Sequence, residues 1–294
     1  MEFRELRYFL GVAKERNITK AAELLNTTQP NLTRQIKNLE WEIGKPLFIR
    51  GKRQLTLTDA GQLLQKRAEE ILGLYRRTEK ELRSTPSDIE GEVAIGSAES
   101  YSLKIISRSV KAMQEKHPRI RILITSGDAP DTIEKLDKGL LDFAVLIESA
   151  DLSAYDNLPL NRSDRWGVIV RKDDPLTELE RVTKEDLLSR PLICSKQSME
   201  EKLIEKFFQR PLSELNIKAV YNLIYNAALL TEEGVGCALT LENLVYVGSE
   251  SELRFRPLEP QLLSPLYLVW KKFAVLSPAA RAFLDELKPL TAEP

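Results

Sequence analysis

A run of polar side chains between positions 28 and 37 carries the clearest chemical pattern in this 294-residue chain. Leu32, Ile36 and Leu39 recur at the spacing of one helix face and should pack inward. The opposite face then presents amide, hydroxyl and cationic groups. Amides pair in bidentate fashion with adenine, arginine pairs with guanine, and threonine contacts phosphate or a thymine methyl group. This pattern predicts DNA contact by Thr28, Gln29, Pro30, Asn31, Thr33, Arg34 and Lys37; the alternative is a face that is merely solvated.

A cationic hairpin is predicted just after this helix. Residues 47–50 and 55–58 have the composition of two strands, with a turn at 51–54 between them. The cations at its tip, Arg50, Lys52 and Arg53, suit contact with a phosphate backbone. Residues 1–85 hold 17 Lys and Arg against 11 Asp and Glu, whereas the remainder holds 26 against 33. This excess of positive charge indicates that the N-terminal part meets a polyanion.

The elements that position these side chains are two shorter helices ahead of them. The first has apolar residues at helical spacing, namely Phe3, Leu6, Leu10 and Ala13. The second contains the pair Ala21 and Ala22, which permits close helix approach, and its expected N-cap is Thr19. Thr28 is expected to cap the third helix, with Pro30 in its first turn. Three helices and a hairpin predict a winged helix-turn-helix domain over residues 1–60.

The same stretch resembles the DNA-binding domain of the LysR-type transcriptional regulators. The matching segments are FLGVA at 9–13, AAELL at 21–25, TQPNLTRQIKNLE at 28–40, IGKPLFIR at 43–50 and LTDAG at 57–61. Two segments depart from the family pattern, NIT at 17–19 and NLT at 31–33. The added amide of Asn31 leaves the operator sequence open, while the binding mode follows the family. The resemblance implies a transcription regulator whose partners are duplex DNA, a small-molecule effector and further copies of the chain.

A long helix is predicted to connect this domain to the rest, over residues 61–85. Residues at spacings of 4 and 3 form a narrow apolar seam, namely Leu64, Ala68, Ile71, Tyr75 and Leu82. Such a seam favours pairing with a second subunit, and the resemblance implies the same dimerising linker. The alternative is a helix that docks on its own domain. A dimer would place two heads on two half-sites, and the family also implies tetramers.

Residues 86–294 alternate strands and helices, which predicts an α/β domain with a mainly parallel sheet. Strands are expected at 92–96, 120–124, 143–147, 166–170, 192–194, 219–221, 236–239 and 267–270, with a closing helix at 278–287. The segments HPRI at 117–120, GLLDFA at 139–144 and EGVGCA at 233–238 resemble the LysR-type effector domain. Thr240 stands where that family usually has proline. The resemblance implies two lobes folded like a periplasmic binding protein.

Ligands of open α/β sheets sit at the carboxyl ends of strands. The polar residues expected there, and matched to the family's effector loops, are Glu99, Ser100, Ser102, Asp128, Glu148, Ser195 and Asn226. The alternative for each is a helix cap or an ordinary loop residue. Three of the seven are carboxylates, which would repel an anion. The sequence therefore favours an effector that is neutral or carries an amine.

Several other classes of protein are disfavoured by the sequence. His117, the single histidine, precedes a proline and has no nucleophile nearby in sequence. No phosphate-binding glycine loop or metal-ligand spacing is present, so we expect no enzyme, no metal and no cofactor. A solute-binding protein would need an export signal and would lack the basic head. The apolar runs are too short to span a membrane, which predicts a cytoplasmic protein.

The two cysteines leave a second function open. Cys194 and Cys237 are far apart in sequence, and both lie in apolar strands. Buried structural thiols are the simpler interpretation. The alternative is a DNA-binding regulator that works without an effector or responds to oxidation through these thiols. RNA polymerase is a further candidate partner for a regulator of either kind.

Overall fold

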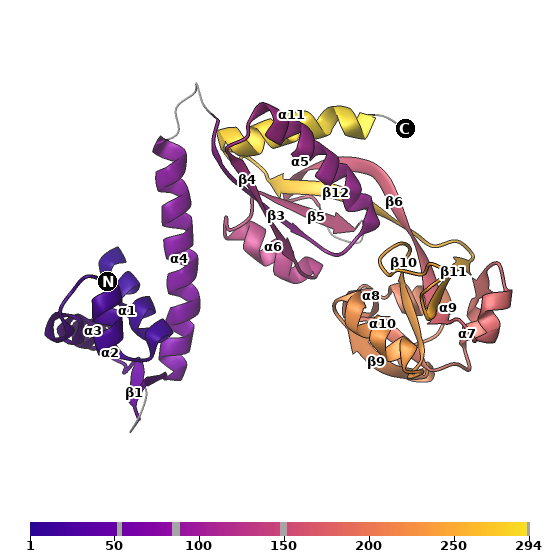
Figure 1. The fold of residues 1–294 in the computed structure, drawn as a ribbon, viewed down its shortest axis with the longest axis horizontal. Coiled ribbons are helices and arrows are strands. Elements are labelled where there is room, and N and C mark those ends of the chain that lie inside the picture. The colour runs from indigo at the N-terminus through magenta and orange to yellow at the C-terminus, as the bar shows by residue number, and fades with distance from the viewer. Residues whose placement is uncertain (52–54, 84–88, 148–151, 293–294) are drawn as a thin grey trace. The chain divides into compact units, whose positions relative to one another are not determined.

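A computed structural model describes residues 1–51, 55–83, 89–147 and 152–292 of the chain. The chain divides into two compact units, Met1–Arg83 and Ser84–Pro294, and each unit is described by itself. Figure 1 labels the elements of both units. No helix of the described ranges is long and apolar enough to cross a membrane.

Three helices form the head of the first unit, α1 (Phe3–Glu15), α2 (Ile18–Leu24) and α3 (Gln29–Ile43). The Thr28 hydroxyl accepts the backbone N–H of Asn31 and caps α3 as predicted. Thr19 was the wrong N-cap for α2, because the carboxamide oxygen of Asn17 accepts the N–H groups of Thr19 and Lys20. An Asn side chain two residues earlier reaches the free N–H groups first, so the helix starts sooner.

The hairpin packs against α3 through one carboxylate. Strands β1 (Phe48–Arg50) and β2 (Leu55–Leu57) pair antiparallel, with Ile49 opposite Thr56. Glu40 Oε1 accepts the backbone N–H groups of Leu47 and Phe48 at 2.8 and 3.2 Å. Leu47 is fully buried in the head core beside Phe9 and Leu39. The recognition helix therefore holds the start of the wing in place.

Helix α4 (Asp59–Arg83) begins directly after the hairpin. Gly61 permits this close approach, because a Cβ there would lie 2.2 Å from the carbonyl oxygen of Leu47. Ala68 and Leu72 are buried in the head core, so the first half of α4 belongs to the head. Figure 1 shows how far α4 extends beyond α1–α3.

The second unit contains two lobes. In the first lobe the parallel strands β4 (Ile120–Ser126), β3 (Gly91–Ser97) and β5 (Phe143–Ile147) adjoin the antiparallel strand β12 (Leu263–Lys271). Helices α5 (Lys104–Lys116) and α11 (Pro278–Ala292) supply Met113 and Phe283 to a core that includes Phe143. Helix α6 (Ala129–Asp137) contributes Leu136 to a separate core.

The second lobe repeats this arrangement with shorter elements. Strands β10 (Cys237–Leu241), β8 (Leu192–Ser195) and β9 (Ile217–Tyr221) are parallel neighbours, with β11 (Leu253–Glu259) and β7 (Val182–Thr183) at the side. Its helices are α7 (Lys184–Leu187), α8 (Lys196–Glu200), α9 (Leu203–Phe208) and α10 (Ile224–Glu232). Helix α10 contributes Ala227 to a core with Ile193 and Ala238.

One strand joins the lobes. Strand β6 runs from Tyr155 to Arg171, far longer than the predicted 166–170, and Figure 1 follows it from one lobe into the other. Its residues Tyr155–Arg165 pair with β12, and Trp166 onwards pair with β10 and β11. Because the two halves belong to different sheets, the turn from one lobe to the other falls at Arg165 and Trp166.

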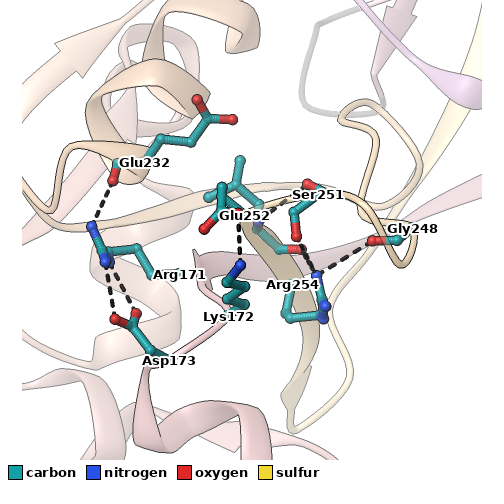
Figure 2. A network of polar contacts seen from close by, with 9 residues as sticks. Arg171, Lys172, Asp173, Glu232, Gly248, Ser251, Glu252 and Arg254 are labelled. Carbon is teal, nitrogen blue, oxygen red and sulfur yellow. Dashed lines mark hydrogen bonds and ion pairs between the residues drawn. The ribbon is translucent and has the colours of Figure 1, made fainter.

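The far end of β6 is held by a network of charges (Figure 2). Two guanidinium nitrogens of Arg171 donate to the two oxygens of Asp173 at 2.9 Å, and the third donates to the carbonyl of Glu232 at 2.9 Å. Lys172 Nζ lies 2.7 Å from Glu252 Oε1. The guanidinium of Arg171 lies at the last carbonyls of α10, where a positive charge is favourable. Its hydrogen bonds to Asp173 lower the pKa of that carboxyl group. The network fastens β6 to α10 and to the start of β11.

Both cysteines lie in the core of the second lobe. Cys194 on β8 is fully buried and Cys237 on β10 nearly so, and both thiols are free. Burial raises the pKa of Cys194 to about 12 and that of Cys237 to about 11. Because the thiolate is the reactive form, such thiols are poor redox sensors.

We expect Glu40→Ala to loosen the start of the wing. Removing the carboxylate leaves the N–H groups of Leu47 and Phe48 without their acceptor, at a cost of about 1–3 kcal/mol. Hydrogen exchange on the full chain should show faster exchange at residues 47 and 48. Glu42→Ala is the matched control, because the one partner of the Glu42 carboxylate among the described residues is the exposed terminal amine of Met1. Equal exchange in the two variants would contradict this role for Glu40.

We also expect both thiols of the folded chain to resist modification. At pH 8 about one Cys194 in ten thousand and one Cys237 in a thousand are ionised, whereas the unfolded chain has an ordinary thiol pKa. An aromatic disulfide reagent should therefore modify the denatured chain within minutes and the native chain over hours. Since both pKa values are raised on folding, their stabilising contribution is present below about pH 9 and is lost toward pH 12. Equally fast modification of native and denatured chains would restore the redox interpretation.

Candidate DNA interface and effector cavity

The outward face of α3 is exposed at Gln29 and Arg34 and half-buried at Asn31 and Thr33, and its side chains form hydrogen bonds along the helix. Gln29 Nε2 donates to Thr33 Oγ1 at 3.0 Å, and Arg34 Nη2 donates to Asn31 Oδ1 at 3.1 Å. Asn31 Nδ2 donates in turn to Thr27 Oγ1 at 2.9 Å. These bonds orient the amides and the guanidinium, and base edges offer the same kinds of partner. The remaining predicted residues Thr28, Pro30 and Lys37 are exposed on the same helix or at its cap.

The wing is described only in part. The backbone of Arg50 ends β1, and its side chain is outside the described residues. Lys52 and Arg53 also lie outside them. The predicted phosphate contacts of the wing therefore rest on the sequence.

On helix α4 some residues of the predicted dimer seam pack on the head and others are exposed. Ala68 is buried in the head and Leu64 packs against the same core. Ile71, Tyr75 and Leu82 are exposed, although the ring of Tyr75 lies 4.6 Å from that of Phe3. The seam prediction left out two further exposed apolar residues of α4, Leu63 and Leu74. The spacing pattern could not separate the face that packs on the head from the face that remains exposed, because both are apolar.

A cavity of about 280 Å³ lies where the two lobes meet. The first lobe supplies Ala98 and Glu99 after β3, Ile147 at the end of β5, and the start of β12. The second lobe supplies the ends of β8, β9 and β10 and the start of α10. The polar residues in its wall are Glu99, Ser195, Gln197, Ser198, Glu201, Tyr221, Asn222, Thr240 and Ser264.

Glu99 bridges the lobes at this cavity. Its Oε2 accepts the backbone N–H of Ile224, the first residue of α10, at 3.0 Å. Lys196 of the second lobe also lies 3.9 Å from Asp128 of the first. In each of these two contacts one residue belongs to the first lobe and the other to the second. Both contacts would break if the lobes moved apart.

The other polar groups of the wall are held within the second lobe or at the crossing. Ser195 Oγ donates to Ser198 Oγ at 2.7 Å, and Trp166 Nε1 donates to Ser264 Oγ at 2.8 Å. Tyr221 donates its hydroxyl to the carbonyl of Leu239 at 2.7 Å. Burial, reinforced by the nearby charge of Glu99, raises the pKa of Tyr221, so this phenol stays neutral.

The seven predicted effector residues are not all brought together. Glu99 and Ser195 line the cavity. Ser100 caps the short helix 101–103, and Ser102 bonds to Asp164 through its N–H and its hydroxyl. Asp128 caps α6 by accepting the N–H of Asp131 at 3.0 Å. Asn226 is exposed on α10, and Glu148 lies outside the described residues.

Sequence analysis missed several residues of the cavity wall, chiefly Trp166, Ser198, Glu201, Tyr221 and Thr240. Thr240 carried a signal, since it departs from the proline usual in the family. The others come together only because β6, β8, β9 and β10 meet at one place. Among the described residues no three His, Cys, Asp or Glu side chains gather in a way that could hold a metal ion.

Comparison with known proteins agrees with this architecture along the whole chain. Residues 3–62 match the family model "Bacterial regulatory helix-turn-helix protein, lysR family", and residues 86–292 match "LysR substrate binding domain". The chain is 28% identical to the HTH-type transcriptional regulator BsdA of Bacillus subtilis, covering 97% of this chain and 99% of that one. It is 28% identical to the Hca operon transcriptional activator HcaR of Escherichia coli, covering 97% and 96%.

The fold has a close counterpart among solved structures. The structure of full-length CbnR complexed with its target DNA matches with a TM-score of 0.77 and 20% identity, over 99% of this chain and 100% of that chain. The predicted fold is thereby confirmed as an N-terminal winged helix-turn-helix followed by a two-lobed α/β effector domain like a periplasmic binding protein. Because both family models match in order and together span nearly the whole sequence, the chain belongs to the LysR family of DNA-binding transcriptional regulators and is not an enzyme.

Proposed function

We propose that the chain regulates transcription by coupling the closure of its two lobes to the way its heads meet an operator. The observation that carries this proposal is the bond from Glu99 to Ile224, which spans the wall of the cavity. A ligand in the cavity contacts both lobes at once, and it therefore changes their equilibrium arrangement if it binds one arrangement more tightly. The effector site of this proposal is the cavity wall.

The proposed DNA contact is the outward face of α3. On this face Gln29, Arg34 and Lys37 are exposed and Asn31 is half-buried, and the cap at Thr28 puts Gln29 in the first turn of the helix. Gln29, Asn31 and Arg34 have the donors and acceptors that read bases in the major groove. The cations of the wing would add contacts to phosphate. The solved complex of CbnR with its target DNA supports DNA binding by this chain.

The proposed dimer forms along the exposed side of α4. Leu63, Ile71, Leu74 and Leu82 are spaced so that they share one side of the helix, and all are exposed in the single chain. Paired α4 helices would bury this apolar stripe and hold two heads at a fixed spacing. A dimer is what an operator with two half-sites requires. Effector binding would act on this paired state.

The proposed reading face is tested by Arg34→Ala on duplex DNA from upstream of the chain's own gene. Loss of the guanidinium should relax base preference at one position and reduce discrimination there by about 1–3 kcal/mol. Affinity for each single-base variant of the site is measured by gel shift at fixed salt. Arg4→Ala is the matched control, because Arg4 lies on α1 and pairs with Glu2. Absence of any sequence preference in the unaltered chain would overturn the proposal as a whole.

The proposed dimer is tested by Ile71→Glu. A charge placed in the stripe would be buried on pairing, which is costly, so the mass measured by light scattering should fall toward that of one chain. Leu24→Glu changes an exposed leucine of α2 in the same way and should leave the mass unaltered. If Ile71→Glu keeps the oligomeric mass while folding normally, α4 is not the interface.

A further inference from the structure

We propose that the ligand of the interlobe cavity is a small organic cation, an amine attached to an apolar body. The inference rests on the proposed function, in which this cavity is the effector site, and it specifies the charge of the effector. It narrows the sequence-based expectation, which left neutral and amine-bearing ligands equal.

The ionised side chains in the cavity wall are all negative. Glu99 and Glu201 line it, and no Lys or Arg does among the described lining residues. The four residues that follow Ile147, outside the described part, contain no Lys or Arg either. Lys196 follows Ser195 but does not line the cavity, and it lies 3.6 Å from Glu200 and 3.9 Å from Asp128. Among the described residues that line the cavity, no cation therefore offsets the two carboxylates.

The chain's own carboxylate occupies the place that would otherwise suit an anion. Helix α10 starts at the cavity, its N-cap residue Leu223 provides no side-chain acceptor, and the N-terminus of a helix favours negative charge. Glu99 fills this position from the opposite lobe through its bond to Ile224 N. A carboxylate ligand would have to displace Glu99 or lie beside it, and both are unfavourable.

Both carboxylates retain an oxygen that can accept from a ligand. Glu99 uses Oε2 for Ile224, and its Oε1 has no partner among the residues that the structure describes. Glu201 accepts Gln197 Nε2 at Oε1, at 2.8 Å, and its Oε2 has no partner among the residues that the structure describes. Glu99 belongs to the first lobe and Glu201 to the second. An ammonium group has three N–H donors and no acceptor, so it can satisfy carboxylates from both lobes at once.

The rest of the wall fits an apolar body. Leu203, Ile224, Leu241, Leu244 and Pro265 line the cavity together with the aromatic residues Trp166 and Tyr221. Aromatic rings attract organic cations, and the half-buried Tyr221, which stays neutral because its pKa is raised, adds no charge of its own. A volume of about 280 Å³ suits a ligand with one ring and a short side chain. The cavity thus combines an anionic end that can hold an amine with apolar walls.

The test compares three ligands of nearly the same size on the full chain by calorimetry: 2-phenylethylamine, 2-phenylethanol and phenylacetate. We expect the amine to bind about 10-fold tighter than the alcohol, and the acid to bind weakest. Glu99→Gln and Glu201→Gln keep the shape of each side chain and remove its charge. Each should weaken the amine about 10-fold while changing the affinity of the alcohol by less than about 2-fold, in line with the strength of charge-assisted hydrogen bonds. Glu200→Gln changes the last residue of α8, directly before Glu201 and outside the wall, and is the matched control that should change neither affinity.

Ala98→Phe separates this inference from the proposed function. Ala98 lines the cavity, and a phenyl group there would fill it, so amine binding should be lost while the melting temperature without ligand stays close to that of the unaltered chain. Tighter binding of phenylacetate than of the amine, lost in Ala98→Phe, would overturn the cationic ligand and keep the cavity as the effector site. No detectable binding of the amine at 20 mM would likewise overturn the cationic ligand. Binding that survives Ala98→Phe would contradict the cavity as the effector site.

Discussion

Strand β6 belongs to two sheets at once, and the organisation of the second unit depends on this. Up to Arg165 its backbone pairs with β12, where Arg165 faces Leu263. From Trp166 onwards it pairs with β10, where Trp166 faces Leu241 and Gly167 faces Thr240. Each lobe satisfies the hydrogen bonds of one half of the strand, so neither lobe can be removed without leaving backbone groups of β6 unpaired. The two lobes therefore form one structural unit, and they meet at a fixed place.

The cavity follows from the same crossing. Trp166, Thr240, Leu241 and Leu263 all line it, and all four are partners or neighbours in the register at the point where β6 changes sheets. A strand that passes from one sheet to another leaves a space between the edges of the two sheets. The side chains that fill its wall come from the carboxyl ends of parallel strands in both lobes, as is general for open α/β sheets. The crossing thus provides the site, and the side chains decide its charge.

Polar contacts join the lobes beside this shared strand. Glu99 reaches the start of α10, and Asp128 lies near Lys196. Polar contacts of this kind are exchanged with water at little net cost, in contrast to a packed apolar interface. A ligand bound between the lobes can therefore replace these polar contacts or form further ones. Regulation by a small molecule needs two arrangements that differ by only a few kcal/mol.

Local patterns in the sequence were sufficient to predict the head and most elements of the body. The inward spacing of Leu32, Ile36 and Leu39 matches the buried face of α3, and β5 lies where 143–147 was predicted. Local sequence patterns failed to predict elements and exposed faces that depend on residues distant in the sequence. Strand β11 was missed, because its alternating charges and its proline are stabilised by pairing with β6. The predicted seam on α4 combined residues of the face that packs on the head with residues of the exposed face. Only the packing on the head shows that Ala68 is buried and Ile71 is exposed.

By itself the sequence determined the family, helix α3 with its polar face, and the alternation of strands and helices. All of these depend on neighbours within a few turns or on contiguous segments that resemble the family. The tertiary structure decided which polar residues line the cavity. Glu99 and Glu201 are about a hundred positions apart, and their meeting at one cavity depends on how β6 passes between the sheets. Ser102 and Asp128 were expected beside Glu99, yet each is held by a partner in a cap or a neighbouring strand. Sequence spacing cannot report such pairings, because they are made by chain segments brought together only on folding.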